Sequence, residues 1–320
     1  MSDAVRPHHR FALPAALASV YLIWGSTYLA IALAVRVLPP LLMAGLRFLV
    51  AGGIMLTVLR LLGQPWPDRR QWMGATIVGT LLLAGGNGTV CLVSHAVPSG
   101  VIALVLASTM VCTVLVGWAW GGPRPTPRLA LGILLGLGGV GVLVWHPSQA
   151  WPVWGILALL AAAVSWAVGS VLSKRVAQIT SPGMATGAQM VGGGTVMLVA
   201  GMLHGEWSGI DPAAFPLTTG TTTAILAWVY LVLFGSIIGF GSYVWLLRHA
   251  SPALATSYGY VNPLVAITLG AWLNAEPVTG QTLAAGAVII AAVALIATAP
   301  ASVRSSGRPV VRSSGRQIER

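Results

Sequence analysis

The residue best suited to chemistry is Arg47, a permanently charged side chain inside a long apolar run. A charge in lipid costs several kcal/mol, roughly 2.5–3.5 on insertion scales, so it is expected to have a partner or a task. Seven residues separate it from Pro40, which places it about 10 Å along a helix. Two interpretations follow: Arg47 binds an anionic group in a cavity, or it anchors neighbouring helices through their carbonyl and amide groups.

Uncharged polar and aromatic side chains inside other apolar runs are further candidates. Trp24 and Trp166 either wall an apolar cavity and stack on a ligand, or pack against lipid and protein. Asn262 precedes Pro263, which frees a carbonyl in the preceding turn, and the Asn amide can satisfy that carbonyl or a ligand. The remaining candidates for binding a substrate are Ser26, Asn87, Ser108, Gln189, Tyr243 and Tyr258.

No pattern in the sequence is typical of an enzyme or of an ATP-driven pump. It contains no phosphate-binding loop, no zinc-ligand spacing and no nucleophile motif, and no Asp or Glu lies deep in an apolar run. Cys91 and Cys112 lie inside apolar runs and are interpreted as core residues, with nothing to support a disulfide. We therefore predict no catalytic residue, no metal and no cofactor.

The elements that position these residues are predicted from composition. Of 320 residues, 56% are hydrophobic and 7% charged, against roughly 25% charged in a soluble domain. Apolar runs of about 18 residues or more recur, the length that crosses roughly 30 Å of hydrocarbon, and they lack the alternation of a barrel. This predicts an all-α polytopic membrane protein. Its ten spans are expected at residues 12–33, 40–62, 72–92, 98–120, 128–146, 152–173, 183–204, 224–247, 252–274 and 280–299.

The basic residues are unevenly distributed between the two sides of these spans. With the N-terminus in the cytoplasm, 15 of the 17 Lys and Arg residues lie in cytoplasmic segments. The positive-inside rule therefore predicts that both termini are cytoplasmic. The same distribution accounts for the net charge of +11, so nucleic acid is not an expected partner. The basic tail, residues 300–320, is expected to be disordered, with weak contact to anionic membrane lipid as an alternative role.

The chain also repeats itself. At an offset of 142, the matching residues are Trp24, Pro40 and Arg47 with Trp166, Pro182 and Gln189. At an offset of 154, they are His95 to Pro98 with His249 to Pro252, and Gly122 and Pro123 with Glu276 and Pro277. Residues 11–146 and 152–299 are thus predicted to be two copies of a five-span unit. Because five is odd, the second copy is inverted, as in many secondary transporters, whose substrate site lies near the midplane between the halves.

This arrangement resembles the EamA-type branch of the drug/metabolite transporter superfamily over about residues 12–299. The resemblance is carried by Trp24-Gly25-Ser26-Thr27-Tyr28, Pro40 with Ala44-Gly45-Leu46-Arg47-Phe48, Ser165-Trp166 with Gly169-Ser170, and Asn262-Pro263-Leu264 with Glu276-Pro277. It implies ten helices, inverted repeats and export of amino acids, other metabolites or drugs across a bacterial inner membrane. One departure is that the first half has Gly122 where the second has Glu276, so any role of that carboxylate is not duplicated.

Together these observations predict a secondary transporter that exports a small molecule by alternating access. An importer or exchanger on the same fold is the first alternative. A membrane-embedded enzyme or a lipid scramblase is a weaker one, since paired catalytic groups at depth are missing. A central cavity is expected between the first, third, fourth, sixth, eighth and ninth spans, and the oligomeric state is left open.

Overall fold

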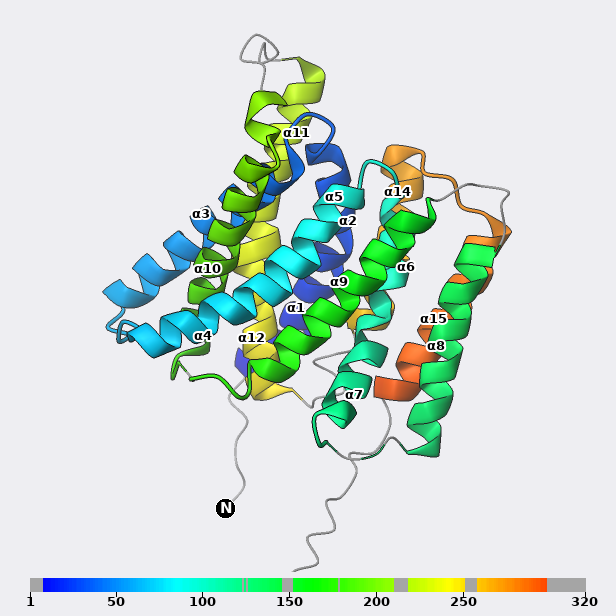
Figure 1. Cartoon of the computed structure of the whole chain (residues 1–320), viewed down its shortest axis with the longest axis horizontal. Coiled ribbons are helices and arrows are strands. Elements are labelled where there is room, and N and C mark those ends of the chain that lie inside the picture. The colour runs from blue at the N-terminus through cyan, green and yellow to red at the C-terminus, as the bar shows by residue number, and fades with distance from the viewer. Residues whose placement is uncertain are drawn as a thin grey trace, which may run out of the picture.

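A computed structural model describes residues 8–122, 124, 126–145, 152–177, 179–209, 218–250 and 258–297, and within these residues it contains helices and no strand (Figure 1). The predicted all-α class is confirmed for this part of the chain. Seven helical stretches are long and apolar enough to cross a membrane. Three shorter apolar helices occupy the remaining predicted spans: α8 (Pro127–Trp145), α14 (Tyr258–Asn274) and α15 (Gly280–Ala297). The basic tail, 300–320, lies outside the described residues.

Three of the seven long stretches are continuous α-helices, and four change geometry partway along. The continuous ones are α3 (Pro40–Leu61), α9 (Val153–Leu172) and α10 (Pro182–Leu203). The first, third and seventh of them each contain a π-helical segment. The first consists of α1 (His8–Ser19), η1 (Val20–Trp24) and α2 (Gly25–Ala34), and the third of α4 (Arg69–Gly79), η2 (Thr80–Gly88) and α5 (Thr89–Val93). The seventh consists of α11 (Thr219–Tyr230), η5 (Leu231–Ile238) and α12 (Gly239–His249). The fourth is interrupted at Ser108, between α6 (Ser99–Ala107) and α7 (Thr109–Ala119). Segments of π-helix are rare and often mark functional sites.

Local sequence accounts for where several helices begin. Pro40 and Pro182 occupy the first positions of α3 and α10. A backbone N–H at this position has no partner within the helix, so proline loses no hydrogen bond there, and its fixed φ suits the helix. Asp68 begins α4 with a reciprocal capping box to Gln71. Large apolar side chains such as Leu203 are strongly exposed, as expected for a surface that faces lipid.

Helices α3 and α10 pack closely through paired glycines, and they lie side by side in Figure 1. A Cβ atom added at Gly45 would lie 2.9 Å from the Gly194 carbonyl oxygen, and one added at Gly52 would lie 2.8 Å from that of Gly187. The two helices therefore run antiparallel with their backbones in contact, as small residues permit. Gly45 and Gly187 are equivalent at the offset of 142, as are Gly52 and Gly194.

This contact makes a stability prediction. Gly45→Ala is expected to lower the thermal midpoint of the purified protein, because the new methyl group meets backbone atoms of α10 as close as 2.7 Å. Overpacking of this kind costs on the order of 1–3 kcal/mol. Gly53→Ala is the matched control on the same helix, since nothing lies within 4 Å of its added Cβ. A thermal midpoint that fell equally in both variants, or in neither, would contradict the proposed close contact.

Four described residues have a positive φ, and all four lie at or just after a helix end. They are Gly63, Gly121, Gly205 and Ala275, with φ values of 84°, 83°, 81° and 49°. Gly63 and Gly205 are separated by 142 residues, and Gly121 and Ala275 by 154, the two offsets of the sequence repeat. The two parts of the chain thus share a backbone feature that the sequence comparison did not use.

Candidate functional site

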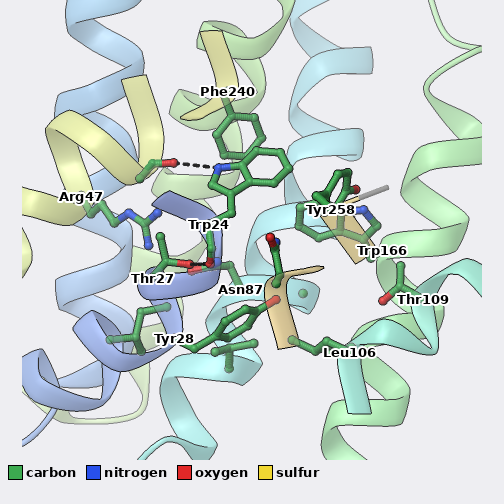
Figure 2. A pocket seen from close by; sticks show the side chains of 16 residues that line it. Trp24, Thr27, Tyr28, Arg47, Asn87, Leu106, Thr109, Trp166, Phe240 and Tyr258 are labelled. Carbon is green, nitrogen blue, oxygen red and sulfur yellow. Dashed lines mark hydrogen bonds between the residues drawn. The ribbon is translucent and has the colours of Figure 1, made fainter. Parts of the chain in front are cut away.

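A cavity lies in the middle of the bundle, walled by the seven longest helical stretches except α10, together with α14 (Figure 2). The wall residues come from both predicted repeats. From the first repeat they are Trp24, Thr27, Tyr28, Ile31, Arg47, Gly86, Asn87, Val90, Leu106 and Thr109. From the second they are Ala162, Trp166, Gly235, Phe240, Tyr258 and Asn262.

The three π-helical segments all contribute to this wall. Trp24 is the last residue of η1, Gly86 and Asn87 lie in η2, and Gly235 lies in η5. A wider helical turn changes which side chains face a neighbour and leaves some backbone carbonyls with altered partners. One such carbonyl, that of Gly235, accepts a hydrogen bond of 3.2 Å from Trp24 Nε1, as Figure 2 shows.

Trp24 is the centre of an aromatic cluster on one side of the cavity. Its ring centroid lies 5.0 Å from that of Phe240, 5.2 Å from Tyr243 and 5.1 Å from Tyr258. Tyr243 and Tyr258 contact each other edge to face at 5.6 Å. Edge-to-face contacts are favourable for aromatic rings. We call these four residues the aromatic cluster, which joins the first helical stretch to α12 and α14.

Arg47 lies in the cavity wall and is 2% exposed. Its Nε donates a 2.9 Å hydrogen bond to Ser236 Oγ, which connects α3 to η5. Its Nη1 atom is buried and has no hydrogen-bond partner among the described residues. One nitrogen thus anchors the side chain to a neighbouring helix, as one of the two interpretations expects, while a second nitrogen is left without a described partner.

The wall also carries neutral polar and aromatic groups. Trp166 faces Gly86, where an added Cβ would lie 2.9 Å from the indole ring. Asn262 is 5% exposed, and its Oδ1 atom is the second buried side-chain atom without a described partner. Asn87 is another of the lining residues, labelled in Figure 2. The cavity is thus mostly aromatic and apolar, with one cation and a few neutral polar groups.

Six of the ten residues predicted to bind a substrate line this cavity. They are Trp24, Arg47, Asn87, Trp166, Tyr258 and Asn262. Tyr243 lies behind the wall, against Trp24 and Tyr258. All six spans predicted to form the cavity contribute to it, and α3 contributes Arg47 in addition.

The other three predicted residues lie outside the lining, each for a local reason. Ser26 is rotated away from the cavity and shares a 2.7 Å hydrogen bond with the Tyr230 hydroxyl. Ser108 turns its hydroxyl back to the Val105 carbonyl, so the residues near it that line the cavity are Leu106 and Thr109. Gln189 places its backbone against Gly79, where an added Cβ would lie 2.1 Å from its carbonyl oxygen.

Helical periodicity was the signal for several lining residues that the prediction missed. Thr27, Tyr28 and Ile31 follow Trp24 at three, four and seven positions, the spacing of one helix face. No polarity signal marked Gly86 or Gly235, whose lack of a side chain admits Trp166 and Arg47. Among the residues that the structure describes, no group of His, Cys, Asp and Glu is arranged to hold a metal ion.

The chain is similar in sequence and in fold to known proteins. The EamA-like transporter family model matches residues 12–145 and again residues 153–298. The chain is 42% identical over 285 residues to the uncharacterized inner membrane transporter YedA of Escherichia coli K12, covering 88% of this chain and 89% of that protein. It is 28% identical over 276 residues to a probable amino-acid metabolite efflux pump of Salmonella typhimurium LT2, covering 85% and 90%. One crystal structure shares the fold, with a TM-score of 0.59 at 21% identity over 89% of this chain and 96% of the other.

The apolar helices and the names of these relatives point to a multi-pass membrane transporter rather than an enzyme. The chain belongs to the EamA-like transporter family.

Proposed function

We propose that this protein is a secondary transporter that exports small metabolites, amino acids or related compounds among them, by alternating access. The observation that carries the proposal is the cavity, whose wall is built from both halves of the chain and includes Arg47, a cation with one unpaired nitrogen. A site between two halves that move against each other is the arrangement that alternating access needs. The direction is supported by the relative named as an efflux pump.

Ten spans in two inverted five-helix repeats, residues 11–146 and 152–299, are part of this proposal. One sequence comparison and two structural observations support it. The family model matches twice, and the positive φ residues recur at the repeat offsets. The antiparallel glycine contact between α3 and α10 joins equivalent positions, as a two-fold axis between the halves would produce.

Transport by the purified protein in proteoliposomes tests the function. A panel of labelled amino acids, organic acids and cationic drugs is loaded inside, and loss is compared with empty liposomes. Saturable loss of at least one solute class is expected, with competition by unlabelled compound. Exchange is distinguished by its need for solute on the receiving side, and export by uptake of solute into inside-out vesicles. Absence of transport for every class, in protein that remains folded, would contradict the proposal.

We also propose that both termini are cytoplasmic, on the strength of the uneven Lys and Arg distribution. A reporter enzyme that is active only outside the cytoplasm, fused after residue 320, is expected to be inactive. The same reporter inserted after Trp207, in the predicted outer loop, is expected to be active. The reverse pattern would contradict the orientation.

A further inference from the structure

Two buried atoms in the cavity wall, Arg47 Nη1 and Asn262 Oδ1, have no hydrogen-bond partner. Buried polar atoms in proteins are almost always paired, and an unpaired one carries its full desolvation cost. Both side chains are at least nine-tenths buried, and both come from the wall of one cavity. Neither atom is solvent-accessible, so a ligand in the cavity supplies the two missing partners only when the Arg47 and Asn262 side chains turn toward it.

The two atoms require different chemistry from a ligand. The guanidinium nitrogen is a cationic donor, which pairs best with an anionic oxygen. The amide oxygen is an acceptor, which pairs with a hydroxyl or ammonium hydrogen. The same cavity is lined by Trp24, Tyr28 and Trp166, which suit a flat apolar body.

The positive charge of Arg47 is free to meet a ligand. Three acidic residues lie in the described part of the chain, and each makes hydrogen bonds elsewhere: Asp68, Glu206 and Glu276. Ser236 fixes the guanidinium through a neutral hydroxyl and the Phe48 ring lies 4.6 Å from its central carbon, so none of its described partners is an anion. The missing side chain at Gly235 leaves room for Arg47 Nη2, which an added Cβ would approach to 3.1 Å.

We propose that the cavity binds organic acids that also carry a hydrogen-bond donor on a compact apolar body. The carboxylate meets Arg47, the donor meets the Asn262 amide oxygen, and the apolar body lies against the tryptophans. The inference rests on the proposed function, because it assigns the substrate class of the same cavity.

Binding of matched probes to the purified full-length protein tests this assignment. 3-Phenyllactate and L-phenylalanine carry the acid with a hydroxyl or an ammonium donor, 3-phenylpropanoate lacks the donor, and 1-phenylpropan-2-ol lacks the acid. At least one of the first two is expected to bind about tenfold or more tightly than either incomplete probe. Tighter binding of 3-phenyllactate identifies the preferred donor as a hydroxyl, and tighter binding of L-phenylalanine identifies it as an ammonium group.

Separate variants test the role of the Arg47 guanidinium and that of the Asn262 amide. Arg47→Gln is expected to remove the advantage over 1-phenylpropan-2-ol, and Asn262→Leu the advantage over 3-phenylpropanoate. Ser108→Ala, which alters a polar residue outside the lining, is expected to change neither. If Arg47→Gln does not fold, Ser236→Ala removes the positioning hydroxyl and is expected to weaken the acid-bearing probes selectively. Equal binding of all probes, or binding of none, overturns the substrate class, while transport of other solutes in the proteoliposome panel would leave the proposed function intact.

A second inference concerns the two glutamates at the predicted outer face. Glu276 follows α14 and reaches α6, where its Oε2 accepts hydrogen bonds from Ser99 Oγ at 2.9 Å and from the Gly100 amide at 3.3 Å. Its Oε1 accepts a 3.0 Å bond from Asn274, whose Oδ1 accepts one from Arg36. The carboxylate therefore joins the start of a first-half helix to the end of a second-half helix.

Glu206 makes an equivalent connection at the start of α3. Its carboxylate accepts backbone hydrogen bonds from Leu41 at 3.0 Å and Leu42 at 2.9 Å. The carboxylate of each glutamate thus lies against the first turn of another helix, α3 or α6. Free N–H groups and the helix dipole favour a negative charge there. Because each glutamate belongs to the second half and each helix to the first, both contacts cross between the halves.

The backbone around each glutamate is shaped for this contact. The preceding residue, Gly205 or Ala275, has a positive φ, and for Ala275 this is a strained conformation. Gly270 leaves space for the second carboxylate, since an added Cβ would lie 2.5 Å from Glu276 Oε2. At the equivalent positions of the first half, Gln64 and Gly122 replace the two glutamates, so the cytoplasmic face has no matching pair of carboxylates.

We infer that Glu206 and Glu276 form a latch that holds the outer side of the transporter closed. We call this pair the outer latch. Opening toward the outside separates the halves at that face and breaks these inter-half bonds. Loss of the latch is therefore expected to favour the outward-open state. The inference rests on the proposed topology, in which this face is external.

Accessibility of a cavity residue measures the effect. Ile31 lines the cavity and is 1% exposed, so Ile31→Cys, with Cys91 and Cys112 replaced by alanine, reports opening in intact cells. Its labelling by a membrane-impermeant thiol reagent added outside is expected to rise about tenfold when both Glu206→Ala and Glu276→Ala are present, a shift comparable with typical conformational coupling. The matched control is Asp68→Ala, which removes a capping carboxylate from α4 without crossing the halves.

A second variant keeps the test decisive if the double replacement does not fold. Gly270→Ala retains both charges but displaces the Glu276 carboxylate, and it is expected to raise labelling in the same direction. Unchanged labelling in folded variants, or an equal rise with Asp68→Ala, overturns the latch. Failure of the proposed topology gives a different result: Ile31→Cys is then labelled from the cytoplasmic side when the latch is removed.

Discussion

Replacing Trp24 by alanine is expected to reduce transport to the level of empty liposomes and to lower the thermal midpoint. The indole contacts three aromatic rings and donates to the Gly235 carbonyl, so it fixes the first helical stretch against η5, α12 and α14. Trp24 is partly buried, so its truncation is expected to cost at most the roughly 3–5 kcal/mol of a fully buried tryptophan. The variant also removes one wall of the cavity, which removes contacts from any substrate held there.

Two controls separate these effects. Trp24→Phe keeps an aromatic ring for the aromatic cluster but lacks the Nε1 donor, and it is expected to retain part of the transport. Trp154→Ala on α9 removes an indole that is 53% exposed and outside the cavity lining, and it is expected to change neither property. Full transport by Trp24→Ala would show that the aromatic cluster has no part in the transport cycle.

Replacing Gly235 by valine is expected to abolish transport through a different cause, displacement of Arg47. A Cβ at this position would lie 3.0 Å from Thr27 Cγ2 and 3.1 Å from Arg47 Nη2, and valine adds two further methyl groups. The guanidinium then loses its place beside Ser236, although its charge remains. The thermal midpoint is expected to fall modestly, by the roughly 1–3 kcal/mol of an overpacked site.

Gly241→Val is the matched control for this prediction. Gly241 belongs to the same long helical stretch, and nothing lies within 4 Å of its added Cβ. The two substitutions change helix propensity alike, so a difference between them reports the contact with Arg47 and Thr27. Equal transport by both variants would contradict the positioning role assigned to Gly235.

Much of this architecture follows from sequence because a membrane imposes strong constraints. Helices are required to satisfy backbone hydrogen bonds in lipid, and apolar runs of sufficient length mark them. Arg47 was identified as a candidate because a charge in such a run demands a reason. Trp24 and Trp166 were identified by duplication, and the structure places both at the cavity.

The remainder depends on rotation about helix axes, which a list of polar residues does not encode. Ser26 and Thr27 are neighbours of similar polarity, yet the first faces Tyr230 and the second the cavity. The π-helical segments and the interruption at Ser108 shift this rotation partway along a helix. The cap contacts of Glu276 were also beyond sequence, because they join residues 177 positions apart.

The central claim is that one cavity opens alternately to the two sides of the membrane. The most direct measurement uses Thr109→Cys, at the cavity wall, in protein whose Cys91 and Cys112 are replaced by alanine. A membrane-impermeant thiol reagent is applied from one side at a time, in right-side-out and inside-out vesicles, with and without a transported solute. The account predicts labelling from both sides, with the solute raising the rate from one side as it lowers the rate from the other. Labelling from neither side, or rates from the two sides that rise together as in an open channel, would contradict it.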